Sequence, residues 1–215
     1  MTARKAPNGM ASRVAPRDGL DDFPTPCWAT RALLRHLDPD LFAFFDMTVR
    51  EPAANRGYMV RPLAEAFGNV EASDIHDYGA GFPVRDYLSG PLPDMVDWTI
   101  TNPPFVLADK FIARAAETSR AGFAMLLRVQ FLEGGDRLKT LFGPMPPAVV
   151  APFAERVPIL KGQMSPKART TMAYAWFIWR RQEGRSFAAP RTVVQWIAPC
   201  RRALELPGDY FWGGA

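Results

Sequence analysis

An apolar, β-prone run at 96–101 leads directly into Asn102-Pro103-Pro104-Phe105, and a helical pattern follows. Consecutive prolines have a fixed φ and cannot donate backbone hydrogen bonds, and each pushes the residue before it into extended geometry. We therefore expect a strand that ends in a stiff corner, where carbonyls and the Asn102 amide accept hydrogen bonds beside an aromatic ring. Such a corner suits a planar group that carries an NH2, although Asn-Pro is also an ordinary turn starter.

Strands and helices alternate along most of the chain. Apolar residues at helical spacing predict helices, and short apolar runs bounded by Gly, Pro or acidic residues predict strands. The helices are expected at 25–37, 56–67 and 108–118, and the strands at 47–50, 70–75, 96–101 and 123–127. This order predicts an α/β fold with a mostly parallel sheet and helices on both faces. Two further runs, at 173–179 and 192–197, have no clear helix between them, so we expect them to pair as an antiparallel edge.

Length and composition indicate one cytoplasmic domain. The chain has 215 residues, of which 48% are hydrophobic, which is enough for one full core. We expect a disordered segment at 1–20, a single domain at 21–200 and a C-terminal tail at 201–215. No apolar run reaches the roughly 18 residues of a membrane span, and the polar N-terminus does not read as a signal peptide. Two cysteines and two histidines, scattered along the chain, predict neither a disulfide framework nor a metal site.

The first two strands end in segments that suit a nucleoside-like ligand. Residues 51–57 read Glu-Pro-Ala-Ala-Asn-Arg-Gly, a loop of small residues before a helix, which lets a ligand approach the backbone closely. The loop is not G-x-G-x-x-G, so a dinucleotide site is poorly supported. Asp74 ends the second strand about twenty residues later, where an acid accepts from ribose hydroxyls in related folds. Asp86 with Tyr87, or alternatively Asp77, would serve an adenine amino group and ring.

The chain resembles S-adenosylmethionine-dependent DNA adenine-N6 methyltransferases, especially the compact phage and prophage type. The Asn102–Phe105 corner is similar to the catalytic motif of that family, and residues 51–57 are similar to its first cofactor loop. Phe23-Pro24-Thr25-Pro26-Cys27-Trp28 looks like its N-terminal cofactor motif. Residues 131–134 and 174–177 stand where such proteins carry similar segments. The resemblance covers about residues 23–179, and the catalytic motif is its most specific part.

The resemblance implies a class I methyltransferase-like, Rossmann-like sheet of seven strands with an antiparallel edge hairpin. It implies a site-specific adenine-N6 enzyme in the cytoplasm of a bacterial host, with S-adenosylmethionine as cofactor and DNA as partner. The implied catalytic residues are Asn102, Pro103, Pro104 and Phe105. The implied cofactor-binding residues are Phe23, Thr25, Pro26, Trp28, Glu51, Pro52, Ala53, Asn55, Gly57, Asp74, Ile75, Asp86, Tyr87 and Asn102. Asn102 and Pro103 would accept the two hydrogens of the adenine amine, and Phe105 would stack on a base flipped out of the duplex.

One residue departs from the family pattern. Asn55 stands where the family usually has glycine, and asparagine tolerates left-handed geometry better than most residues. We therefore expect the loop to form, although the affinity for cofactor is open.

The net charge of +4 permits a nucleic-acid partner without requiring one. The candidate phosphate contacts are Arg156, Lys161, Lys167 and Arg169, of which the last three belong to a polar loop at 161–171. A solvated basic loop explains them equally well. The aromatic residues Trp176, Phe177, Trp179 and Trp196 alternate within strands, which favours packing on the sheet over base stacking.

Three other functions remain open at this point. Asn-Pro-Pro with an aromatic residue would also serve an enzyme that methylates adenine in RNA, or one that methylates a glutamine side chain in a protein. The glutamine type would be expected to carry a separate N-terminal substrate domain and a glycine-richer loop, and neither is visible. A non-catalytic nucleic-acid-binding relative is the third alternative, and Asn55 is the only hint in its favour.

Overall fold

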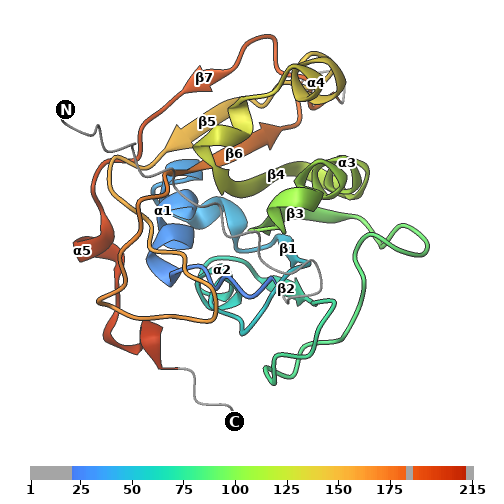
Figure 1. The fold of residues 1–215 in the computed structure, drawn as a ribbon. Helices are drawn as coiled ribbons and strands as arrows, with labels where there is room; N and C mark the ends of the chain where they lie inside the picture. The colour runs from blue at the N-terminus through green and yellow to red at the C-terminus, as the bar shows by residue number, and fades with distance from the viewer. Residues whose placement is uncertain (1–20, 183–185, 212–215) are drawn as a thin grey trace, which may run out of the picture.

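The computed structural model describes residues 21–182 and 186–211, so the segment expected to be disordered, 1–20, lies outside the described residues. Seven strands form one sheet in the order β2-β1-β3-β4-β6-β5-β7 (Figure 1). The strands are β1 (Thr48–Glu51), β2 (Asn69–Ala72), β3 (Val96–Thr101), β4 (Ser119–Arg128), β5 (Val149–Pro152), β6 (Tyr174–Arg180) and β7 (Val193–Val194). The first four are mutually parallel, β6 is antiparallel to both β4 and β5, and β7 is parallel to β5.

The predicted α/β class, with its mostly parallel sheet and antiparallel hairpin, is confirmed, but the hairpin uses other partners than expected. β5 and β6 form it, and β6 lies between β4 and β5 rather than beside 192–197. The reason is burial: Trp176, Phe177 and Trp179 of β6 are fully buried, so this strand needs cover on both faces and both edges. The later run contributes only the short edge strand β7. Its Trp196, which we expected to pack on the sheet, is 71% exposed.

Helices cover both faces of the sheet. They are α1 (Cys27–Leu37), α2 (Val60–Ala64), α3 (Ala108–Thr118), α4 (Gly135–Arg137) and α5 (Arg201–Leu204), with short turns η1 (Phe42–Phe44), η2 (Phe105–Leu107), η3 (Val129–Leu132), η4 (Leu138–Phe142) and η5 (Pro207–Tyr210). α1 and α2 pack on one face in a cluster with Ile100 and Trp176, whereas α3 packs on the other with Phe123 and Phe177 (Figure 1). Successive residues of β6 thus belong to different cores, as the pleat of a strand requires.

The starts of two helices differ from prediction. The first helix is predicted to start at Thr25, but α1 begins at Cys27, after Pro26, and no side chain caps it. The second helix starts at Val60 rather than near Arg56, because Gly57 has a φ of +83° and the chain still turns there. The third helix is confirmed at its predicted bounds.

The C-terminal segment folds back onto α1. Arg31 of α1 is buried and donates to the Asp209 carboxylate, at 2.7 and 2.9 Å, and to that of Glu65, at 2.6 and 2.7 Å. It also donates to the Leu204 carbonyl at 2.9 Å. The residues expected as a tail therefore carry α5 and η5, which pack against the domain. Among the described residues, no helix is long and apolar enough to cross a bilayer.

Candidate active site

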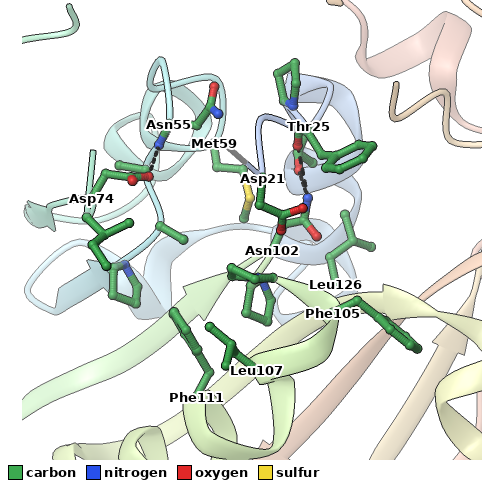
Figure 2. A pocket seen from close by; sticks show the side chains of 18 of the residues that line it. Asp21, Thr25, Asn55, Met59, Asp74, Asn102, Phe105, Leu107, Phe111 and Leu126 are labelled. Atoms are coloured by element: carbon green, nitrogen blue, oxygen red, sulfur yellow. Dashed lines mark hydrogen bonds between the residues drawn. The ribbon is translucent and has the colours of Figure 1, made fainter. Parts of the chain in front are cut away.

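A cavity of about 790 Å³ opens at the carboxyl ends of the parallel strands, where ligands bind in open α/β sheets. The chain reaches it from the segment before α1, the loops after β1 and β2, the corner after β3, and the ends of β4 and β6 (Figure 2). Fourteen of the sequence-predicted site residues line it: Phe23, Thr25, Pro52, Ala53, Asn55, Asp74, Ile75, Asp86, Tyr87, Asn102, Pro103, Pro104, Phe105 and Lys161. Segments far apart in the sequence thus meet at one edge of the sheet.

The Asn102 amide is held in one orientation. Its nitrogen Nδ2 donates to the Phe23 carbonyl at 3.2 Å and to the Thr25 hydroxyl at 3.0 Å. A backbone carbonyl can only accept, so the nitrogen must face it and the oxygen Oδ1 must point the other way. Within the described ranges, no residue donates to this oxygen or to the Pro103 carbonyl. The corner therefore presents two free acceptors, as an NH2 group requires.

Phe105 lies on the far side of Asn102 from Asn55 and Asp74, as Figure 2 shows. Its ring is 36% exposed and meets the buried Phe131 ring edge to face, with 6.0 Å between centroids. The guanidinium of Arg128, at the end of β4, lies 5.5 Å from the Phe105 centroid. This end of the cavity thus has an open aromatic face for a planar group, bordered by a cation.

The loop after β1 forms with asparagine in the glycine position. Asn55 has a φ of +50°, in the left-handed region that asparagine tolerates. Its backbone N–H donates to Asp74 Oδ2 at 2.8 Å, and its side chain donates to Asp22 Oδ1 at 3.0 Å. Arg56 pairs with the same Asp22 carboxylate at 2.6 Å. The expectation that this loop still forms is confirmed, and the N-terminal segment holds it from one side.

Glu51 shapes this loop from below rather than lining the cavity. Its carboxylate is fully buried, and Oε1 accepts from the Thr101 hydroxyl at 2.6 Å and from the Ala53 N–H at 2.9 Å. The other oxygen, Oε2, has no partner among the described residues. Burial raises the pKa of Glu51 to about 8, against the lowering effect of its two hydrogen bonds. Glu51 therefore acts on a ligand only through the backbone that it holds.

Two acids that line the cavity, Asp74 and Asp86, accept hydrogen bonds from their own loops. Asp74 is 8% exposed and accepts from the backbone N–H of His76 at 3.0 Å, besides that of Asn55. Asp86 accepts from Ser89 and Leu88, and the Ser89 hydroxyl is the main cause of its lowered pKa. The competing candidate Asp77 lies outside the cavity, where it accepts from Gly79 in a turn.

Tyr87 and Tyr78 place aromatic rings in the part of the cavity that Asp74 and Asp86 line. Tyr87 is buried against Phe111, with 5.2 Å between ring centroids. Tyr78 lies under the Arg56 guanidinium at 5.7 Å, and burial raises its pKa to about 12. We did not predict Tyr78 as a site residue, although it lies in a loop rich in Gly and Tyr.

Several predicted site residues lie elsewhere. Trp28 has no exposed surface and packs edge to face on Phe153 in the core, so its predicted contact with a cofactor is not supported. Pro26, Glu51 and Gly57 form the backbone around the cavity without lining it. The basic residues Arg156, Lys167 and Arg169 are exposed and outside the cavity, and only Lys161 of that group reaches it.

Five lining residues carry a charge or hydroxyl that sequence reasoning missed: Asp21, Tyr58, Tyr78, Arg128 and Tyr174. Arg128 and Tyr174 stand at neighbouring ends of β4 and β6, paired in register, so only the sheet order brings them together. Asp21 comes two residues before the predicted N-terminal motif. Among the described residues, no group of acidic, histidine or cysteine side chains is arranged to hold a metal ion.

No protein-family model matches the sequence, and no curated protein sequence matches it either. Solved structures do resemble it. Over 81% of this chain, the fold matches a Listeria monocytogenes protein assigned as a class I S-adenosylmethionine-dependent methyltransferase, with a TM-score of 0.59 and 11% identity. The chain has the class I methyltransferase fold.

Two further structures share the fold. One is a Pyrococcus horikoshii protein assigned as an RNA methyltransferase, with a TM-score of 0.57 and 13% identity over 78% of this chain and 90% of that one. The other is the methyltransferase subunit of a type I restriction-modification system from Streptococcus thermophilus, also with a TM-score of 0.57 and 13% identity, over 84% of this chain. The chain spans 65% of the Listeria protein and 48% of the Streptococcus subunit.

Proposed function

We propose that the protein transfers a methyl group from S-adenosylmethionine to the exocyclic N6 amine of adenine in DNA. The observation that carries this proposal is the Asn102 amide, whose nitrogen is held by Phe23 and Thr25 so that its oxygen is left free beside the free Pro103 carbonyl. Two acceptors at the mouth of a class I cavity match the two hydrogens of an adenine amine.

The cofactor half of the cavity fits a nucleoside with a charged tail. Asp74 is placed to accept from ribose hydroxyls, since a carboxylate has about four acceptor positions and backbone N–H groups take two of them. Ile75 and Tyr87 offer apolar cover for a base, and Asp86 lies beside them. When bound, S-adenosylmethionine supplies an electrophilic methyl group on a sulfonium.

The residues around Asn102 make the amine reactive by position and charge. The N6 lone pair of adenine is delocalised into the ring, so the amine is a poor nucleophile. Acceptors on both hydrogens orient that lone pair and place partial negative charge where positive charge develops on the nitrogen. The Phe105 ring holds the base plane by stacking, which keeps the nitrogen in line for attack.

The substrate half of the cavity favours nucleic acid as the carrier of the amine. A base inside a duplex cannot enter a cavity of this kind, so the adenine must be flipped out or single-stranded. Lys161 and Arg128 line the cavity, with Arg128 beside the Phe105 ring, and Lys167 and Arg169 lie exposed on the same loop as Lys161. The structural likeness to a restriction-modification methyltransferase subunit supports DNA, whereas the likeness to a protein assigned as an RNA methyltransferase keeps RNA as the rival substrate.

Transfer of labelled methyl from S-adenosylmethionine to unmethylated DNA, RNA and protein tests the proposal. We expect the label in N6-methyladenine of DNA, and Asn102→Ala to abolish transfer while its far-UV circular dichroism stays that of the wild type. Label confined to RNA or to a protein glutamine would replace the proposed substrate. No transfer at all, with DNA binding intact, would favour the non-catalytic alternative. Undiminished transfer by Asn102→Ala would refute the role of the corner.

A further inference from the structure

The proposed reaction leaves one proton without an acceptor. As the N6 lone pair bonds to the methyl carbon, the sulfur–carbon bond breaks, its electron pair stays on sulfur, and N6 becomes cationic. The nitrogen must then lose a proton to give neutral N6-methyladenine. The Asn102 amide oxygen and the Pro103 carbonyl oxygen are far too weakly basic to keep that proton at neutral pH, although they can accept hydrogen bonds.

Three carboxylates line the cavity, and two of them accept hydrogen bonds from their own loops. Asp74 accepts from the backbone N–H groups of Asn55 and His76. Asp86 accepts from Leu88 and Ser89, and these bonds lower its pKa, which makes it a poorer proton acceptor. Asp21 differs, because no described residue donates a hydrogen bond to its carboxylate. Of the three, only Asp21 has its full acceptor capacity free.

Asp21 also lies on the appropriate side of the cavity. It comes just before Phe23 and Thr25, which hold the Asn102 nitrogen at 3.2 and 3.0 Å, and in the view of Figure 2 it lies on the side of Thr25 and Asn102, with Asp74 on the other side. The cations that act on it electrostatically are Lys161 and Arg128, which both line the cavity, and the Arg128 guanidinium lies 5.5 Å from the centroid of the Phe105 ring. Its place just before Phe23 and the nearby Arg128 cation associate Asp21 with the Asn102–Phe105 part of the cavity.

We propose that Asp21 is the catalytic base, which accepts the proton of the methylated N6 nitrogen directly or through one water molecule. The proposal rests on the proposed function and adds to it the destination of the proton. The carboxylate becomes a carboxylic acid in this step and returns its proton to solvent when the product leaves, so no further reactant is needed.

The electrostatic setting suits this role. Burial raises the pKa of Asp21 above its ordinary value, and Asp22 adds to the effect, while Lys161 and Arg128 act against it. Tyr174 and Tyr78 also interact electrostatically with this carboxylate, and burial raises the pKa of both, so they are neutral at neutral pH. The carboxylate is therefore a stronger base than a solvated aspartate. Turnover should fall as the pH drops through its pKa, because only the ionised form can take the proton.

Asp21→Asn tests the proposal, with Glu117→Gln on the exposed surface of α3 as the charge-matched control. At saturating DNA and cofactor, we expect kcat of Asp21→Asn to fall by about 10²- to 10⁴-fold, its acidic limb to vanish from the pH profile, and Asp21→Glu to recover part of the rate. Calorimetric titration with S-adenosylhomocysteine should give the same Kd for Asp21→Asn and wild type.

Each other outcome overturns the proposal in a distinguishable way. A normal kcat with a Kd for S-adenosylhomocysteine weakened tenfold or more would make Asp21 a cofactor ligand instead. A normal kcat with a normal Kd would leave the carboxylate without either role. If the wild-type protein itself transfers no methyl group to DNA, the proposed function fails and this inference fails with it.

Discussion

The Thr25 hydroxyl lies 3.0 Å from the amide nitrogen of Asn102, although the two residues stand 77 positions apart in the sequence. The Phe23 carbonyl and this hydroxyl together accept hydrogen bonds from the NH2 group of the Asn102 amide. The segment before α1 thus decides which way the amide of the corner faces. Its Asp22 carboxylate also binds Asn55 and Arg56 of the loop after β1. The short segment before α1 therefore holds both the Asn102 corner and the loop after β1 in place.

Thr25→Val should slow turnover without unfolding the protein. Valine keeps the shape of threonine but removes the acceptor, so the Asn102 amide is held by the Phe23 carbonyl alone and can rotate its oxygen away from the amine. A hydrogen bond of this kind is worth roughly 0.5–1.5 kcal/mol, which corresponds to a fall in kcat of about 2- to 13-fold. Methyl transfer to an adenine-containing oligonucleotide measures it, with the exposed Thr140→Val as control. Equal kcat in both variants would show that Phe23 suffices.

Asn55→Ala should destabilise the protein more than Asn55→Gly. Alanine at a φ of +50° carries about 1–2 kcal/mol of backbone strain. Glycine adopts this geometry freely, and both variants lose the side-chain bonds to Asp22 and to the Arg56 N–H. The difference between the two free energies of unfolding should therefore be about 1 kcal/mol in favour of glycine. Urea denaturation at constant pH measures it. Equal stabilities would mean that the loop relaxes out of the left-handed region.

The buried Glu51 carboxyl predicts a pH dependence of stability with a definite sign. Its pKa is about 8 in the folded protein and about 4.5 when solvated. Between these values the folded protein keeps a proton that the unfolded chain releases, so the free energy of unfolding falls as the pH rises through this window. Each pH unit within this window lowers the free energy of unfolding by up to about 1.4 kcal/mol.

Glu51→Gln should remove this dependence, because glutamine imitates the protonated acid and keeps an acceptor for Thr101 and the Ala53 N–H. Denaturation of wild type and variant at several values between pH 5 and 8 compares them. Over this range, we expect the free energy of unfolding of the wild type to fall by a few kcal/mol relative to that of the variant. Parallel curves, such as those expected for the exposed control Glu117→Gln, would mean that Glu51 ionises with an ordinary pKa.

Local chemistry made the sheet edge predictable from the sequence. Two prolines end the strand at Thr101, an acid follows β2 at Asp74, and small residues follow β1. Each of these features is determined by residues within a few positions of it in the sequence. Since the carboxyl ends of parallel strands share one edge, the α/β pattern alone brings these three segments together. The cavity half that surrounds Asn55, Asp74 and Asn102 follows from that.

The other half depends on contacts that no local signal encodes. Arg128 and Tyr174 meet only because β6 lies beside β4, and an apolar run such as 174–179 does not state which strands it will pair with. Trp28 is the last residue of a cofactor-like motif, yet its position on α1 places its side chain in the core. The side chain of Thr25 fits a helix cap as well as it fits the Asn102 amide. Only the folded chain decides between them.

Removing Lys167 and Arg169 together should weaken DNA binding mainly through its salt dependence. Both are exposed on the loop that begins at Lys161, outside the cavity. Contacts of this kind bind phosphates without reading sequence, and each releases bound counterions. The slope of log Kobs against log salt should therefore become shallower by about 1.8 for duplex DNA, or about 1.4 for single strands, in the double alanine variant.

Fluorescence anisotropy of labelled oligonucleotides over a salt series measures these slopes and also reports which form of DNA the loop contacts. Arg35→Ala is the control, because Arg35 is exposed on α1, eight residues past the start of the helix and so about 12 Å along its axis from the cavity end. The control should keep the wild-type slope. An unchanged slope in the double variant would mean that this loop is solvated in the complex and that Lys161 and Arg128, inside the cavity, carry the phosphate contacts.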